Sequence, residues 1–268
     1  MPPLFEVLAR EGFRKTIPSK EELFNWPCII DFKVGGVNLC INRTVLLEFL
    51  AMAVVAIVFI VAFRKPSVVP RGLQNVMEGL YQFVTRDVVQ AVMGREGLVW
   101  QPYLMVLFAF AFAVSILEVI PGLQFPVSSR IAVPAFLAIG SWLIYNYAGI
   151  SKKGFIGYFR DVMFPPGVPW FAYPLLTPIE LATALILRPF TLAIRLFANF
   201  LAGHVLLVVF LLATAYLVVT PITIPFALGA LVMAVMVVGL EIFIAVVQAY
   251  VFTILTAVFI QLATSEEH

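Results

Sequence analysis

Residues 187–207 read LRPFTLAIRLFANFLAGHVLL, an apolar stretch that also carries Arg188, Arg195, Asn199 and His204. The surrounding apolar run is too long for a strand in the core of a soluble protein. An arginine at the centre of a bilayer costs about 2.5–3.5 kcal/mol on insertion scales, so it is a functional-site hypothesis by default. Arg195 is therefore the first candidate functional residue. The alternative is a structural arginine that pairs with a nearby carboxylate and fixes the register of its helix.

The composition indicates an integral membrane protein. Of the 268 residues, 62% are hydrophobic and 12% are charged, whereas soluble domains have about 45–50% apolar and about 25% charged residues. The net charge of +2 is too small to indicate nucleic-acid binding. The chain has no P-loop, no HExxH motif and no cysteine pair at zinc spacing, so we expect no cofactor or metal. Cys28 and Cys40 are the only cysteines, and they either form a disulfide or remain free thiols.

The apolar runs predict an all-α integral membrane protein with five membrane crossings and one amphipathic surface helix. Residues 1–44 are expected to form an extracytoplasmic N-terminal segment, and residues 45–268 a transmembrane helical domain. In residues 70–93, apolar positions recur at helical spacing with polar residues between them, which favours a helix on the membrane surface. A helix packed on a protein partner is the alternative. We place the five crossings at 45–63, 103–120, 131–147, 177–215 and 225–262.

The third crossing and the segment after it carry local signals. Tyr145, Asn146 and Tyr147 end the third crossing, as is typical of aromatic residues at a membrane interface. Residues 149–174 contain several prolines and glycines, which predicts a loop. Thr177-Pro178-Ile179-Glu180 fits a helix start, with Thr177 as the N-cap and Glu180 as its capping-box partner.

The last two helices are expected to be long and strongly tilted. Each has about 38 residues, or about 57 Å at 1.5 Å per residue, against a hydrocarbon core of about 30 Å. Such helices must tilt, bend or run partly along the membrane, and Arg188-Pro189 is the expected position of a bend. The basic residues beside the surface helix and in residues 149–174 place these segments in the cytoplasm. This puts the N-terminus outside and the C-terminus in the cytoplasm.

Helical geometry sorts the polar residues of these two helices into faces. At 100° per residue, Asn199 lies within about 40° of Arg195, whereas His204 points to the opposite side. Glu241 and Gln248 are seven residues apart and share one face of the last helix. We therefore expect Glu241 to meet His204 and Gln248 to approach Arg195. A simpler role for Gln248 is an interhelical hydrogen bond that only supports packing.

Carboxyl and imidazole groups inside a membrane are what a proton path needs, because each takes up and releases a proton. His204 and Glu241 supply one such pair. Glu118 lies near the outer end of its span and is a candidate entrance residue. Glu180 lies near the inner side, and a route to the cytoplasm is compatible with its capping role.

Two short motifs resemble the signature of subunit a of F-type ATP synthases: RLFAN at 195–199 and AGH at 202–204. The sequence QAYVF at 248–252 and the tail SEEH at 265–268 are similar to that family too. The likeness is strongest over about residues 174–268. The order of one span, a surface helix, two spans and two long helices extends it across most of the chain. The first 44 residues carry no matching motif.

The resemblance implies the stator half of a proton path, packed against a rotating ring of c subunits that each carry a buried carboxylate. Arg195 would face the ring carboxylates and block a proton leak between two aqueous half-channels. His204 and Glu241 would form a proton-active pair, with Asn199 and Gln248 also on the path. The resemblance further implies peripheral-stalk b subunits as partners and no catalytic nucleotide site on this chain. The length of the chain and its extended outer N-terminal segment favour the inner (plasma) membrane of a bacterium over the membrane of an organelle.

Two other hypotheses remain open at this point. In the first, the chain is a stand-alone ion channel or secondary transporter with Arg195 as a clamp for substrate or ion. In the second, it is a membrane scaffold whose polar residues only hold helices together. The transported ion, H⁺ or Na⁺, is also open, because groups that coordinate Na⁺ would lie largely on the ring.

Overall fold

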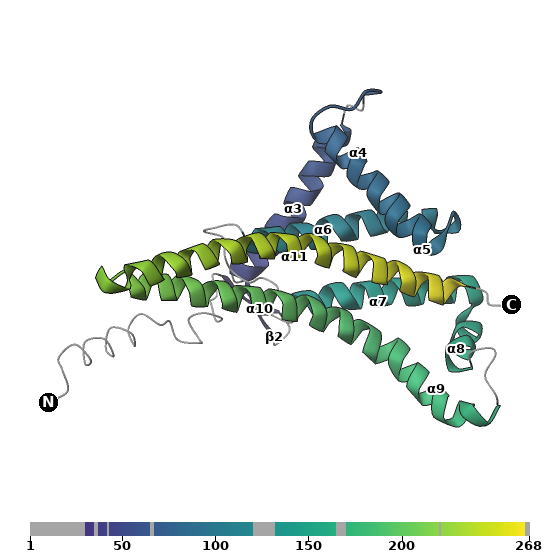
Figure 1. Ribbon diagram of the computed structural model, residues 1–268. Helices are drawn as coiled ribbons and strands as arrows, with labels where there is room; N and C mark the ends of the chain where they lie inside the picture. Colours follow the sequence, from purple (N-terminus) through teal and green to yellow (C-terminus); the bar gives the residue numbers. More distant parts are fainter. Residues whose placement is uncertain are drawn as a thin grey trace. The chain divides into compact units, whose positions relative to one another are not determined.

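The computed structural model describes residues 30–34, 37–41, 43–64, 67–119, 132–164, 170–219 and 221–265 (Figure 1). Two short strands, β1 (Ile30–Val34) and β2 (Val37–Ile41), form an antiparallel hairpin in which Ile30 pairs with Ile41. Among the described residues, all regular structure after this hairpin is helical. The expected all-α architecture is thus confirmed for the described residues from Arg43 onward. The question of a bridge between Cys28 and Cys40 lies outside the described residues.

Five apolar helices occupy the positions where crossings were predicted. They are α3 (Arg43–Phe63), α6 (Gln101–Val119), α7 (Ala132–Lys153), α10 (Arg188–Leu217) and α11 (Ile224–Thr264). Helix α7, the run that ends with α10, and α11 are each long and apolar enough to cross a membrane, whereas the apolar parts of α3 and α6 are shorter. Five crossings therefore remain a prediction.

Shorter helices connect these elements. Residues 73–93, here called the amphipathic helix, comprise α4 (Leu73–Phe83), the π-helix η1 (Val84–Gln90) and α5 (Ala91–Met93). The other short elements are the 3-10 helices η2 (Glu96–Val99), η4 (Trp170–Ala172) and η6 (Pro221–Thr223), the helices α8 (Phe155–Met163) and α9 (Tyr173–Ala182), and the π-helix η5 (Thr183–Leu187).

The described residues form two compact units. The larger unit contains residues 51–201 and 243–265, and the smaller unit contains residues 202–242 and the described residues before 51. In the smaller unit, Leu207 of α10 packs with Ala234 and Val237 of α11. Helices α10 and α11 contribute residues to both units.

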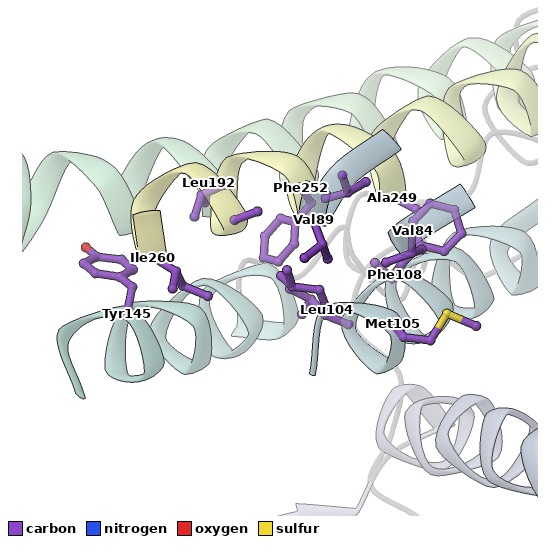
Figure 2. Packing of buried hydrophobic residues seen from close by; sticks show 14 of the residues in the cluster. Val84, Val89, Leu104, Met105, Phe108, Tyr145, Leu192, Ala249, Phe252 and Ile260 are labelled. Atoms are coloured by element: carbon purple, nitrogen blue, oxygen red, sulfur yellow. The ribbon is translucent and has the colours of Figure 1, made fainter. Parts of the chain in front are cut away.

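The amphipathic helix contributes to the core of the larger unit. Its buried residues Val84 and Val89 pack with Leu104 and Phe108 of α6 and with Phe252 of α11, as Figure 2 shows. The apolar face of this helix is thus covered in part by its own chain. The expected position of the helix at the membrane surface remains a prediction.

The buried side of α11 in the larger unit is made largely of small side chains. Small residues let neighbouring helices approach closely inside a membrane. The threonine hydroxyls on this side donate to carbonyl oxygens one turn earlier, Thr253 to Ala249 over 2.8 Å and Thr256 to Phe252 over 2.9 Å. Neither hydroxyl is therefore left unsatisfied on the packing surface. The small buried residues are Ala245, Ala249, Thr253, Thr256, Ala257 and Ala263.

The loop predicted over 149–174 is wrong for most of its length, because α7 continues to Lys153 and α8 follows. Gly154, with φ of 73°, makes the turn between the two helices, a conformation that glycine adopts without steric cost. Lys153 in the last turn of α7 pairs with Asp161 of α8 at 2.8 Å. Its positive charge also stabilises the carboxyl end of α7.

The predicted helix start at Thr177 is wrong as well. The helix begins at Tyr173, with Pro174 in the first positions, where no backbone N–H is needed. Thr177 lies inside the helix, and its Oγ1 donates to the carbonyl of Met163 over 2.8 Å. Glu180 is consequently not a capping residue.

Candidate functional site

Arg195 lies on α10 with its side chain exposed. The salt bridges among the described residues are Lys152–Glu96 and Lys153–Asp161, and neither involves Arg195. The guanidinium keeps its charge at all physiological pH values and presents five N–H donors. Such a group in an apolar helix needs a partner or water. Within the described part of the chain no carboxylate supplies one.

The surface next to Arg195 is formed by small side chains. Thr191 and Ala198 lie within about 60° of Arg195 around the helix, and both are exposed. The Thr191 hydroxyl donates to the carbonyl of Leu187 over 2.8 Å and does not project as a free polar group. A second helix can therefore come close to Arg195.

Asn199 and Gln248 join the two long helices within the larger unit. The Asn199 Nδ2 atom donates to the Gln248 Oε1 atom over 2.7 Å. Gln248 is only 3% exposed, and its Nε2 atom is buried with no hydrogen-bond partner among the described residues. The sequence predicted that Gln248 approaches Arg195. In the structure Gln248 is hydrogen-bonded to Asn199, which lies one helical turn after Arg195 on α10. A free amide donor thus lies beside this turn.

Glu241 lies against the backbone of Gly203 in the smaller unit. A Cβ atom at position 203 would be 2.9 Å from Glu241 Oε1 and 3.2 Å from its Cγ. Gly203 immediately precedes His204, and both His204 and Glu241 are half-buried. The structure therefore brings Glu241 to the residue beside His204, without a hydrogen bond between the two among those described. The sequence analysis gave Gly203 no role beyond its place in the AGH motif, although a small residue in a membrane helix lets a neighbour approach closely.

The two other acidic candidates lie apart from these pairs in the chain. Glu180 is half-buried on α9, and its carbonyl accepts the backbone N–H of Thr183. Glu118 belongs to α6, but its side chain lies outside the described residues. Among the described residues there is no group of three or more His, Cys, Asp or Glu side chains that could hold a metal ion.

A buried polar network near the end of α7 was not predicted. Tyr145 and Asn146 were expected at the membrane interface, yet both are buried, whereas Tyr147 is 68% exposed. The Tyr145 hydroxyl donates to the carbonyl of Ala184 over 2.8 Å, and the Tyr158 hydroxyl donates to Asn146 Oδ1 over 2.9 Å. These contacts span up to 39 residues, so no local sequence pattern could have revealed them.

Arg188 approaches the same region. Its guanidinium lies 5.4 Å from the centre of the Phe259 ring, a cation–π contact with α11. Tyr145 packs against the same ring, with 5.7 Å between the ring centres. The first residue of α10 is thereby anchored to α11.

These features together define a helical membrane protein that carries a charged arginine and several titratable or amide side chains within its apolar helices. Such residues are typical of proteins that move ions or protons. The family described as ATP synthase A chain matches residues 45–261. The chain therefore belongs to the ATP synthase subunit a family, and the resemblance seen in RLFAN and AGH is confirmed.

Curated relatives cover nearly the whole chain. ATP synthase subunit a of Frankia alni is 44% identical over 95% of this chain and 87% of its own length. The subunit a of a Parafrankia species is 42% identical over 95% of this chain and 85% of its own length. That of Rhodococcus erythropolis is 38% identical over 98% and 94%. Membership of this family assigns the chain to a membrane complex with other subunits, and to ATP synthesis and proton transport.

Proposed function

We propose that the chain is the stator half of a proton path, with Arg195 facing the carboxylates of a rotating c-subunit ring. The observation that carries the proposal is the exposed guanidinium on α10, which has no acidic partner among the described residues. The small residues Thr191 and Ala198 beside it leave room for an approaching helix. A membrane carboxylate on a neighbouring protein would supply the missing counter-charge.

The chemistry of Arg195 follows from its permanent charge. A guanidinium within about 4–6 Å of a carboxylate lowers the pKa of that carboxylate, so it helps a ring site to release its proton. Arginine does not itself release a proton in proteins. Arg195 therefore separates two aqueous half-channels without passing a proton between them. The membrane potential supplies about 2.3 kcal/mol per charge for each 100 mV.

The remaining polar residues are assigned to the two half-channels. His204 and Glu241 take up and release protons, and Glu118 is the entrance from outside. Glu180 leads to the cytoplasm. What supports the pairing of His204 with Glu241 is the approach of Glu241 to the residue before His204.

Asn199 and Gln248 complete the path beside Arg195. The Asn199–Gln248 hydrogen bond occupies one end of the buried Gln248 amide and leaves its Nε2 atom as a donor for water on the path.

The same proposal sets the partners and the orientation. The chain contacts the c-ring and the peripheral-stalk b subunits in the inner (plasma) membrane. Residues 1–44 lie outside the cytoplasm, residues 45–268 form the transmembrane helical domain with five crossings, and the C-terminus is cytoplasmic. The nucleotide chemistry of ATP synthesis takes place on other subunits of the complex.

Replacement of Arg195 by alanine tests the proposal. In inverted membrane vesicles that contain the whole complex, we expect Arg195→Ala to abolish proton-driven ATP synthesis while the complex still assembles. Arg160→Ala is the matched control, because Arg160 is exposed on α8, outside the apolar spans. Retained synthesis in Arg195→Ala would refute the proposal, and failed assembly would favour the scaffold hypothesis.

A second measurement addresses the stand-alone channel. The purified chain, reconstituted alone in liposomes, is expected to conduct no protons under an applied potential, because half of the path belongs to the ring. Proton flux through the isolated chain that disappears in Arg195→Ala would favour the channel or transporter hypothesis.

A further inference from the structure

The helix that carries Arg195 has an irregular turn two turns earlier. Residues Thr183–Leu187 form the π-helix η5, which ends directly before Arg188-Pro189. The backbone N–H of Arg188 donates to the carbonyl of Thr183, five residues back, instead of to Ala184. A π turn of this kind inserts one extra residue into an α-helix.

This arrangement leaves the carbonyl of Ala184 without a backbone donor. Its α-helical donor would be the N–H of Arg188, which is directed to Thr183. Its π-helical donor would be the N–H of residue 189, but proline has none. Ala184 is buried, and a buried carbonyl without a hydrogen bond is costly.

Tyr145 supplies the missing donor from another helix. Its hydroxyl donates to the Ala184 carbonyl over 2.8 Å, and its side chain is 0% exposed. The Tyr145 ring is held against Phe259, whose ring also lies beneath the Arg188 guanidinium. The cluster around Tyr145 and Ile260 lies at one end of the core in Figure 2. The hydroxyl is therefore fixed by packing at a carbonyl that the π turn and Pro189 leave open.

We propose that Tyr145 is a positioning residue that holds the π turn and so fixes the direction of Arg195 relative to Glu180. Each residue of an α-helix turns the chain by about 100°. If the π turn became regular α-helix with the same number of residues, one part of the helix would rotate against the other by about that amount. The importance of this angle for transport rests on the proposed function, in which both side chains serve one proton path. The hydrogen bond itself and its effect on the turn do not depend on that function.

The first test measures the geometry of the helix directly. Spin labels are attached at Ile179 and Ile194, two exposed positions on either side of the π turn, in complexes whose chain carries Cys28→Ala and Cys40→Ala. Electron paramagnetic resonance then gives the distance between the labels. We expect Tyr145→Phe to shift the mean distance by about 2 Å or more, or to split the distribution, since one residue contributes a rise of 1.5 Å and a rotation.

The matched control for this test is Tyr147→Phe, which removes a hydroxyl from an exposed ring on the same helix. We expect its distance distribution to equal that of the parent. A distribution that is unchanged in Tyr145→Phe would overturn the proposal, and so would an equal change in both variants.

The second test asks whether the hydroxyl acts through the Ala184 carbonyl. Pro189→Ala restores a backbone N–H that is able to donate to this carbonyl. We expect Tyr145→Phe to slow ATP-driven proton pumping on the order of fivefold to tenfold, because the buried Ala184 carbonyl loses the hydrogen bond from Tyr145 and the π turn is destabilised. In the Pro189→Ala background the same change is expected to cost less than twofold, and equal losses in both backgrounds would overturn the proposal.

Failure of this inference is distinguishable from failure of the proposed function. If Arg195→Ala retained synthesis while Tyr145→Phe shifted the label distance, the π-turn role of Tyr145 would stand and the proton-path role of Arg195 would fall. If Arg195→Ala abolished synthesis while Tyr145→Phe left the label distance unchanged, the reverse would hold.

Discussion

Replacement of Gly203 by alanine tests whether the carboxyl group of Glu241 has to lie where the structure places it. The new Cβ atom would be 2.9 Å from Oε1, 3.2 Å from Cγ and 3.4 Å from Cδ of Glu241. Ordinary contact begins at 3.4 Å, so the carboxyl oxygen has to move by about 0.5 Å. Because a misplacement of 1 Å costs about 100-fold in rate, we expect ATP-driven proton pumping to fall roughly threefold to tenfold. Gly203→Val, with two further methyl groups, is expected to lower it by about 100-fold.

The assay is proton pumping in inverted vesicles, normalised to assembled complex, with thermal unfolding as a parallel measurement. Alanine favours a helix over glycine by about 0.8–1.0 kcal/mol, so a loss of pumping without a loss of stability points to the displaced carboxyl group. Gly239→Ala on α11 is the matched control, since no atom lies within 4 Å of its added Cβ. The shorter side chain of Glu241→Asp is expected to restore part of the pumping of Gly203→Ala. Parent-like pumping in Gly203→Val, or an equal loss in Gly239→Ala, would refute the reasoning.

Three further predictions concern the larger unit, and each is checked by thermal unfolding of the purified complex. Asn199→Ala should lower the free energy of unfolding by about 1–3 kcal/mol, because it leaves both ends of the buried Gln248 amide without a partner. Replacement of both residues by leucine should cost less than Asn199→Ala alone, and a larger loss in the double variant would contradict this. Gly149→Ala should lower the free energy of unfolding by about 1–3 kcal/mol, since its Cβ would lie 2.5 Å from the buried ring of Tyr158. The control Gly140→Ala, whose Cβ has no atom within 4 Å, should be neutral or stabilising. Equal melting temperatures of the two variants would show that the Tyr158 ring moves freely. Burial raises the pKa of Tyr158 above its ordinary 10.0, so the folded state favours the neutral hydroxyl. This contribution to stability is present below pH 10 and is lost as the pH rises further. The melting temperature of Tyr158→Phe should therefore depend less on pH above pH 10, and identical pH profiles of variant and parent would count against a buried, titrating hydroxyl.

The apolar helices could be predicted from the sequence because lipid-facing and buried positions are both apolar. The predicted runs at 45–63, 103–120, 131–147 and 225–262 all lie within or across observed helices. Local signals failed where a distant contact decided the structure. Thr177 has the sequence pattern of an N-cap, but its hydroxyl is used by the carbonyl of Met163, and the helix begins a turn earlier.

In the candidate site too, some features follow from the sequence and others depend on distant contacts. The spacing of Arg195 and Asn199 on one helix, and of Glu241 and Gln248 on the other, follows from the period of the α-helix. The Asn199–Gln248 hydrogen bond is consistent with these faces. The roles of these residues in proton transfer stay predictions.

Other contacts had no local signal. The hydrogen bond from Tyr145 to Ala184 depends on a π turn and on a contact across 39 residues. No periodicity in one sequence reports either of these. Pro189 marked the place of the irregularity, but not the residue that compensates for it.

The row of alanine and threonine along α11 decides what kind of attraction holds this helix to its neighbours. Hydrocarbon tails are as apolar as the side chains they touch, so expulsion of water gives little preference for protein over lipid at this depth. Attachment then depends on how closely two backbones fit, and one additional methyl group would part them along several turns. The position of α11 against its neighbours is thus set by small side chains that carry no charge.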